Sequence, residues 1–233
     1  MQQTPLAWLK LMQITDSALP IGTLSHSFGL ETLIAEGLLS VERLPLFIRD
    51  YFVEAGRVEG ICCLNAYDLL AANNTLEFDS QWLSLNYQLD ALKLARESRE
   101  ASAALGRRFL QLAIGLDSQP ILERALAVNK SQASHTHHCA AFGLTCGAWA
   151  IPPELAVAAF LQQSLVTLVS VCQRLLPLGQ TDASHLIWEM KWAIAEVAQQ
   201  CLDRNSLIPP MFAPLLEVAS MRHPDLSTRL FIS

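Results

Sequence analysis

The segment Leu155 to Gln173 carries no charged residue and is long enough to cross a bilayer as a helix. Its centre, however, contains the polar sequence Gln162-Gln163-Ser164, which a membrane span would have to bury in lipid. Pro152-Pro153-Glu154 precedes it, and proline at the first helical position is typical of helices in water-soluble proteins. We therefore expect a buried central helix and no contact with a membrane.

Apolar residues recur at spacings of three and four along the rest of the chain, which indicates further helices. No segment alternates with period two for long, no Asn-Gly or Asp-Gly hairpin turn occurs, and no repeat of constant length is present. The pattern predicts an all-α fold, a single globular bundle of about ten helices over residues 1–223. We expect helices over 8–14, 28–34, 46–52, 61–72, 77–92, 94–116, 121–129, 139–150, 155–173, 181–202 and 213–222.

Local signals set several of the expected boundaries. Thr23 or Ser25 is expected to cap the second helix, which should stop at Gly37. Glycines at positions 56 and 60 predict a bend, and Pro209-Pro210 predicts a linker. Residues 224–233 follow a helix-breaking proline and have little core of their own, so we expect a tail that becomes ordered on a partner.

The chain has a lower fraction of charged residues than an average domain. Hydrophobic residues make up 52% of the sequence and charged residues 16%, against about 25% charged residues in typical domains. The net charge of −6 excludes a basic surface for nucleic acid. Such a composition favours apolar surface that a partner protein covers.

Six cysteines lie mostly within apolar helical patterns, and none forms a Cys-x-x-Cys pair. We expect them to be small core side chains in a reducing compartment, the cytoplasm. Met1 to Pro5 lacks the basic start and the apolar stretch of a secretory signal, which agrees with that expectation.

The loop that contains His135, His137, His138 and Cys139 has the residue types of a transition-metal site. The spacing is too crowded for all four side chains to converge on one ion. Two interpretations stay open: a solvated loop that enters a helix, or a weak surface site for nickel or zinc.

Patterns for catalysis are weak. Ser25 and His26 are adjacent, so on a helix their side chains point about 100° apart rather than toward each other. The sequence contains no Gly-x-Ser-x-Gly elbow, and Pro20-Ile21-Gly22-Thr23 lacks the lysine of a phosphate-binding loop. We therefore expect a protein that is not an enzyme and that needs no cofactor.

Polar residues gather where the central helix ends. Arg174 lies off the apolar stripe of this helix. Pro177 and Gly179 then interrupt the helical backbone, and Gln180 follows. Arg174 and Gln180 form a recognition surface in one interpretation; in the other they satisfy open helix carbonyls and each other. Arg174 and Glu31 are also candidates for a buried salt bridge.

Four stretches, in this order along the chain, resemble the UreF family of urease accessory proteins: Ala18–Glu31, Arg96–Gly106, Arg174–Thr181, and Ala219–His223 followed by Arg229–Ser233. Their order and spacing agree with the family over the whole chain. The sequence departs from the family pattern at Thr23 and Ala183, where glycine is usual, at Pro224, where glutamate is common, and at Ile232, where arginine is common.

The resemblance implies an all-α, often dimeric chaperone that makes and breaks no bonds itself. Such proteins bind a second accessory protein, UreD (also called UreH), and recruit the GTPase UreG, so that nickel reaches apo-urease. The alternative is a helical scaffold for a different GTPase or metalloenzyme maturation system. A third class is a carrier that holds an apolar ligand in its helical core.

Partner-binding residues follow from the two signature stretches and the tail. Polarity at helix ends makes Ser25, His26, Glu31, Arg174 and Gln180 candidates for the UreG contact. The tail is expected to bind UreD through apolar anchors and a few fixed charges. Its candidates are Arg222, Leu226, Arg229, Leu230 and Phe231.

Overall fold

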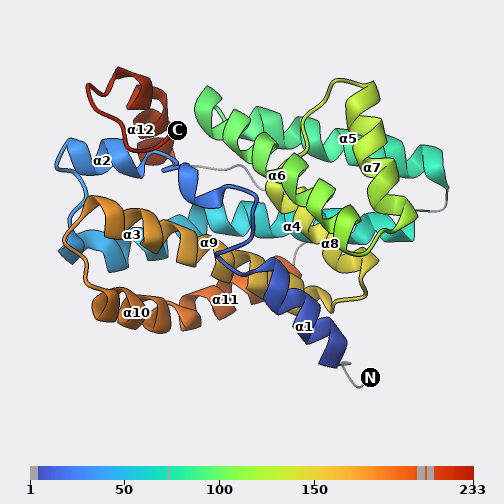
Figure 1. The fold of residues 1–233 in the computed structure, drawn as a ribbon, viewed down its shortest axis with the longest axis horizontal. Helices are drawn as coiled ribbons and strands as arrows, with labels where there is room; N and C mark the ends of the chain where they lie inside the picture. Colours follow the sequence, from blue (N-terminus) through green and yellow to red (C-terminus); the bar gives the residue numbers. More distant parts are fainter. Residues whose placement is uncertain (1–4, 73, 204–207, 209–212) are drawn as a thin grey trace.

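The structure is a computed structural model that describes residues 5–72, 74–203, 208 and 213–233. Among these residues the regular structure is entirely helical, which confirms the expected all-α fold (Figure 1). The α-helices are α1 (Pro5–Ile14), α2 (Leu30–Ala35), α3 (Leu44–Tyr51), α4 (Arg57–Asp68), α5 (Thr75–Leu92), α6 (Arg96–Leu116), α7 (Pro120–Ser131), α8 (His138–Ala148), α9 (Pro153–Leu175), α10 (Gln180–Glu189), α11 (Lys191–Leu202) and α12 (Pro214–Arg222).

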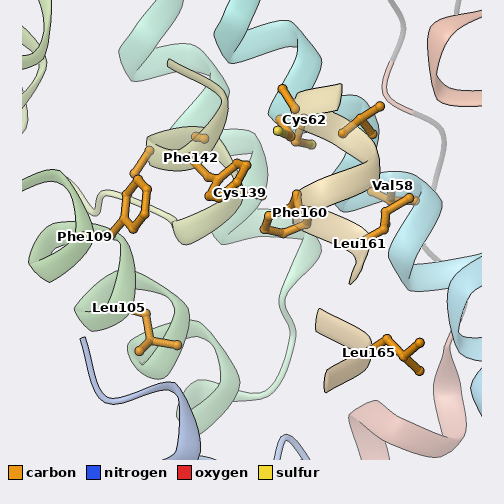
Figure 2. Packing of buried hydrophobic residues seen from close by; sticks show 14 of the residues in the cluster. Val58, Cys62, Leu105, Phe109, Cys139, Phe142, Phe160, Leu161 and Leu165 are labelled. Atoms are coloured by element: carbon orange, nitrogen blue, oxygen red, sulfur yellow. The ribbon is translucent and has the colours of Figure 1, made fainter. Parts of the chain in front are cut away.

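Helices α4, α8 and α9 form the centre of the bundle (Figure 1). Every residue of α8 from Cys139 to Cys146 is buried. The approach of α8 to α4 is close because position 143 is glycine: a Cβ there would lie 1.8 Å from the backbone oxygen of Cys63. Figure 2 shows Phe109, Phe142 and Phe160, from α6, α8 and α9, packed around this centre.

The apolar run of the sequence is α9, and the expectation of a buried central helix is confirmed. By length and composition α9 could span a membrane, but 56% of its most apolar window is buried inside the protein. Phe160, Leu161 and Leu165 face the core in Figure 2. Gln163 is also buried, and its amide donates a hydrogen bond of 3.3 Å to the backbone oxygen of Ile14. The central polar group thus anchors α1 instead of facing lipid.

One expected helix boundary is wrong. The single helix expected over 181–202 is two helices, α10 and α11, which meet at Met190, where ψ is −9°. The break lets α10 pack on α9 while α11 packs on both α9 and α4. Near Gly56, where a bend is expected, a π-helical segment, Phe52–Gly56, joins α3 directly to α4, and Gly60 lies within α4. The linker expected at Pro209-Pro210 lies outside the described residues.

The cap expected for the second helix is also wrong. Thr23 and Ser25 belong to a 3-10 turn, and α2 begins only after Gly29. Gly29 has a φ of 88°, a left-handed conformation that favours glycine, and α12 packs directly on it. A Cβ at this position would lie 2.8 Å from Ser220 Oγ and 2.9 Å from the Leu216 carbonyl oxygen. The contact with α12, rather than a side-chain cap, decides where α2 begins.

All six cysteines are buried thiols within these helices. Burial raises the pKa of Cys172 to about 12 and the pKa of Cys62, Cys139 and Cys146 still further. Such thiols remain protonated and unreactive at neutral pH. They pack as small apolar side chains, as the sequence predicts.

Candidate interaction site at the C-terminal tail

The end of the chain lies against the segment that precedes α2 (Figure 1). The Ile232 N–H donates a 2.9 Å hydrogen bond to the Ser25 carbonyl oxygen, and the Ser27 N–H donates to the backbone oxygen of Ser233. His26 Nδ1 lies 2.7 Å from the Ser233 hydroxyl oxygen. The stretch Ala18–Glu31 and the tail, at opposite ends of the sequence, thus form one site. The tail already packs on the helical domain, and its further ordering by a partner stays a prediction.

Glu31 is the central acceptor of this site. Its side chain is buried, and its carboxylate accepts hydrogen bonds from the Leu230 N–H at 2.6 Å and the Phe231 N–H at 3.2 Å. Nε2 of His223 lies 2.9 Å from the same carboxylate. A buried carboxylate needs such partners, because an unpaired charge in the interior is strongly destabilising. Glu31 therefore holds the tail in place.

His223 connects two acidic side chains. Its imidazole is fully buried, and its Nδ1 lies 2.7 Å from an oxygen of Glu97 on α6. Arg229 in the tail reaches the other oxygen of Glu97 at 3.6 Å. Each of the two ring nitrogens of His223 thus faces a carboxylate oxygen. The network joins α2, α6 and the tail. We define the tail site as this network together with His26, Arg174 and residues 229–233.

His26 is buried below the last residue. Burial, and then the positive charge of Arg108, lowers the pKa of His26, so the ring is neutral at pH 7. A neutral imidazole can exchange a hydrogen bond with the Ser233 hydroxyl without an unpaired charge in the interior.

Arg174 closes the site from the end of α9. Its guanidinium donates a 2.8 Å hydrogen bond to the Leu24 carbonyl oxygen and lies 5.7 Å from the centre of the Phe231 ring. The salt bridge considered between Arg174 and Glu31 is not formed, because each side chain has these other partners. Gln180 is the exposed first residue of α10, beyond the break that follows Arg174.

The tail alternates inward and outward side chains, as an extended chain does. Phe231 and Ser233 are buried, whereas Leu230 and Ile232 are each 70% exposed. The departure from the family pattern at Ile232 therefore alters the outer surface and not the contacts that hold the tail.

The other predicted tail residues lie at the edge of the site. Leu226 is half-buried, and Arg222 is exposed and paired with Glu36 at 2.9 Å, beside α2. Helix α12 also exposes apolar side chains; they are Leu215, Val218 and Met221.

Sequence reasoning missed Glu97 and His223 as members of the site. His223 belongs to a quoted tail motif, so the signal was present but was not read as a partner for Glu31. Glu97 is one of several charged residues near the start of α6, and nothing in its spacing separates it from Glu100, which forms an exposed pair with Arg96 at 4.0 Å.

The four candidate metal ligands separate into two places. Both His138 and Cys139 begin α8; Cys139 is buried and His138 is half-buried, and desolvation lowers the pKa of His138 to about 4 and raises that of Cys139. His135 and His137 instead meet Asp90 of α5, which the sequence did not suggest. The expectation that all four cannot converge on one ion is confirmed.

An interior cavity of about 100 Å³ lies beside the core, between α3, α4, α6, α8 and α9. Glu59 and Lys93, which form an ion pair, line it together with His138 and Gln163. Pockets for small ligands usually have about 300–1,000 Å³ and mostly apolar walls. This cavity is too small to favour the apolar-ligand carrier.

Comparison with known proteins agrees with the resemblance in the sequence. The UreF family model matches residues 39–191. The chain is 33% identical to urease accessory protein UreF of Lachnoclostridium phytofermentans and 30% identical to that of Bacillus sp. (strain TB-90), in each case over 97% of this chain and 98% of the relative. It is 32% identical to UreF of Paenarthrobacter aurescens over 97% of both chains.

Proposed function

Because the chain belongs to the UreF family of urease accessory proteins, we propose that it is a cytoplasmic adaptor for the insertion of nickel into apo-urease. In this role it binds a UreD-type (UreH-type) accessory protein and the GTPase UreG and performs no catalysis of its own. The observation that carries the proposal is the similarity to UreF proteins over nearly the whole chain.

The arrangement of the tail supports a role in binding UreD. Buried hydrogen bonds fix its backbone, while the side chains of Leu230 and Ile232 remain exposed. Rigid apolar side chains lose little conformational entropy when a partner covers them. The rim carries the charges of Arg222 and Arg229, which can give specificity.

Co-expression tests this function directly. The tagged chain, produced with the UreD and UreG proteins of its own organism, should elute with both in size-exclusion chromatography. Urease from cells that lack the gene should contain little nickel, and a plasmid copy should restore the metal. A chain that elutes alone, together with urease of normal nickel content in its absence, would contradict the proposal.

Arg174 separates an interfacial role from a structural one. Arg174→Ala removes one hydrogen bond and one cation–π contact at an exposed side chain, so we expect the free energy of unfolding to fall by only about 1–2 kcal/mol. The variant should fold but lose at least about tenfold in affinity for UreG, as measured by capture on immobilised protein.

A matched control is Arg124→Ala, because Arg124 also makes an exposed contact, with Asp79 at the far end of the molecule. Unchanged binding of UreG by folded Arg174→Ala would rule out the interface, and unfolding of the variant would assign Arg174 a structural role.

The proposal includes a homodimer, and two exposed tryptophans support it. Trp188 on α10 is 69% exposed and Trp192 on α11 is 84% exposed, although tryptophan is usually found in cores or interfaces. We assign this face to a second copy of the chain, since most soluble homo-oligomers pair identical patches. Trp192→Glu should convert the dimer to a monomer in sedimentation equilibrium without loss of helical circular dichroism. A variant that remains dimeric would place the dimer interface elsewhere.

A further inference from the structure

Asp90, His135 and His137 bring three potential metal-ligand atoms to one place, where α5 nears its end and the loop between α7 and α8 crosses it. His135 Nδ1 lies 2.6 Å and His137 Nε2 lies 3.0 Å from Asp90 Oδ1, and all three atoms lie within 4.8 Å of one another. Ligand atoms around a tetrahedral ion lie about 3.4 Å apart. Small side-chain movements would therefore bring these three atoms to the separations that an ion requires.

The loop that carries both histidines is held by hydrogen bonds that do not involve their rings. The Asn129 side chain donates to the His135 carbonyl oxygen at 2.8 Å and to Thr136 Oγ1 at 2.6 Å. The His137 N–H donates to the Asn86 side chain on α5 at 2.9 Å. The backbone positions of both histidines are thus determined before any ion binds, which reduces the entropy cost of forming a site.

Ser102 on α6 supports the ring of His137. Its hydroxyl oxygen lies 3.1 Å from His137 Nδ1, on the side of the ring opposite Asp90. A hydroxyl both donates and accepts, so it can pair with Nδ1 in either tautomer of the imidazole. With an ion at Nε2, Nδ1 would carry the proton and donate it to Ser102, an arrangement that is usual for histidine ligands.

The three side chains also form a site with one open side. His137 is fully buried, Asp90 is 26% exposed and His135 is 44% exposed, so solvent reaches the cluster from the His135 side. Water can complete the coordination there. Two imidazole nitrogens and one carboxylate oxygen suit borderline ions such as zinc and nickel better than calcium or magnesium.

We propose that Asp90, His135 and His137 bind one divalent transition-metal ion per chain, and that the ion links α5 to the loop before α8. The site is separate from the tail site, and it does not depend on the proposed function, because its test requires neither UreD, UreG nor urease. Competition from cysteine is excluded by the structure, since all six thiols are buried.

The test titrates the full-length, chelator-treated protein with ZnCl₂ and, separately, with NiCl₂ in calorimetry, followed by metal analysis after gel filtration. We expect one ion per chain and a metal-dependent rise in Tm, because an ion that binds only the folded state stabilises it. His135→Ala and Asp90→Asn should each weaken binding by about tenfold or more.

His185→Ala is the matched control, because His185 is an exposed histidine on α10, away from the cluster. It should bind the ion as tightly as the unaltered chain. His135→Ala removes a partly exposed loop side chain, so the helical circular dichroism should be unchanged. If that variant does not fold, Asp90→Asn, which preserves the shape of the Asp90 side chain, provides the test. An unaltered chain that takes up no ion, or an His135→Ala variant that binds as tightly, would overturn the proposal.

Discussion

Removal of residues 226–233 is expected to abolish co-purification with a UreD-type protein while the helical circular dichroism remains intact. The removed segment contains no helix, so the signal from α1 to α12 should not change. It does contain the exposed Leu230 and Ile232, and a buried apolar anchor contributes about 1–3 kcal/mol to an interface. The truncation removes both apolar anchors and the charge of Arg229, so little of the proposed binding surface for UreD remains. Pull-down with tagged UreD measures the effect.

Two further variants show which part of the tail is responsible. Leu230→Ala combined with Ile232→Ala removes the outward side chains but leaves the buried Phe231 and the hydrogen bonds to Glu31 in place. Leu76→Ala is the control, because Leu76 is a similarly exposed leucine, 77% accessible, on α5. The double variant should lose UreD and the control should keep it. Full capture of UreD by the truncated chain would mean that the tail is not the binding surface.

Gly143→Ala, which adds a single methyl group, is expected to lower the free energy of unfolding strongly. The added Cβ would lie 1.8 Å from the Cys63 backbone oxygen, and neither α4 nor α8 has a flexible side chain there that could move aside. The two helices must separate at the centre of the core. Overpacking usually costs about 1–3 kcal/mol, and a clash with backbone belongs at or above the upper end. For a chain of this size about 3 kcal/mol lowers Tm by about 6–12 °C, which calorimetry can measure.

Gly115→Ala supplies the comparison. Gly115 also lies in a helix, α6, but a Cβ there would meet no atom within 4 Å. Alanine favours the helix over glycine by about 1 kcal/mol, so this variant should be slightly more stable than the unaltered chain. A loss of stability in Gly143→Ala and a gain in Gly115→Ala would establish that the close contact of α4 with α8 causes the loss. Equal effects would show that α4 and α8 can move apart without cost.

Prediction from the sequence succeeded where the signal is local. The run from Leu155 to Gln173 has an apolar stripe and a proline start, and it is the core of α9. It failed at α2, where neither predicted cap is used because Gly29 packs under α12, and at Met190, where packing on different neighbours divides one expected helix into two. Both errors concern contacts between segments far apart in the chain.

The candidate site shows the same division. Glu31 and Arg174 were selected because polar residues stand at helix ends, and both lie at the tail site. The partner of each was not predictable: Glu31 holds the backbone of Leu230 and Phe231, and Arg174 reaches Leu24. Hydrogen bonds between such distant residues leave no trace in the periodicity of either segment.

By itself, the sequence determined that the protein is helical, that the helix over 155–173 is buried, and the family to which its motifs are similar. Hydrophobic periodicity, proline and glycine act over a few residues, so one sequence is enough to interpret them. Only the tertiary structure decided that the tail folds back on Glu31 and that Asp90 joins His135 and His137, while His138 and Cys139 lie at the start of α8. The physical reason is that each of these groupings depends on how whole helices pack, which brings together side chains that no spacing along the chain relates.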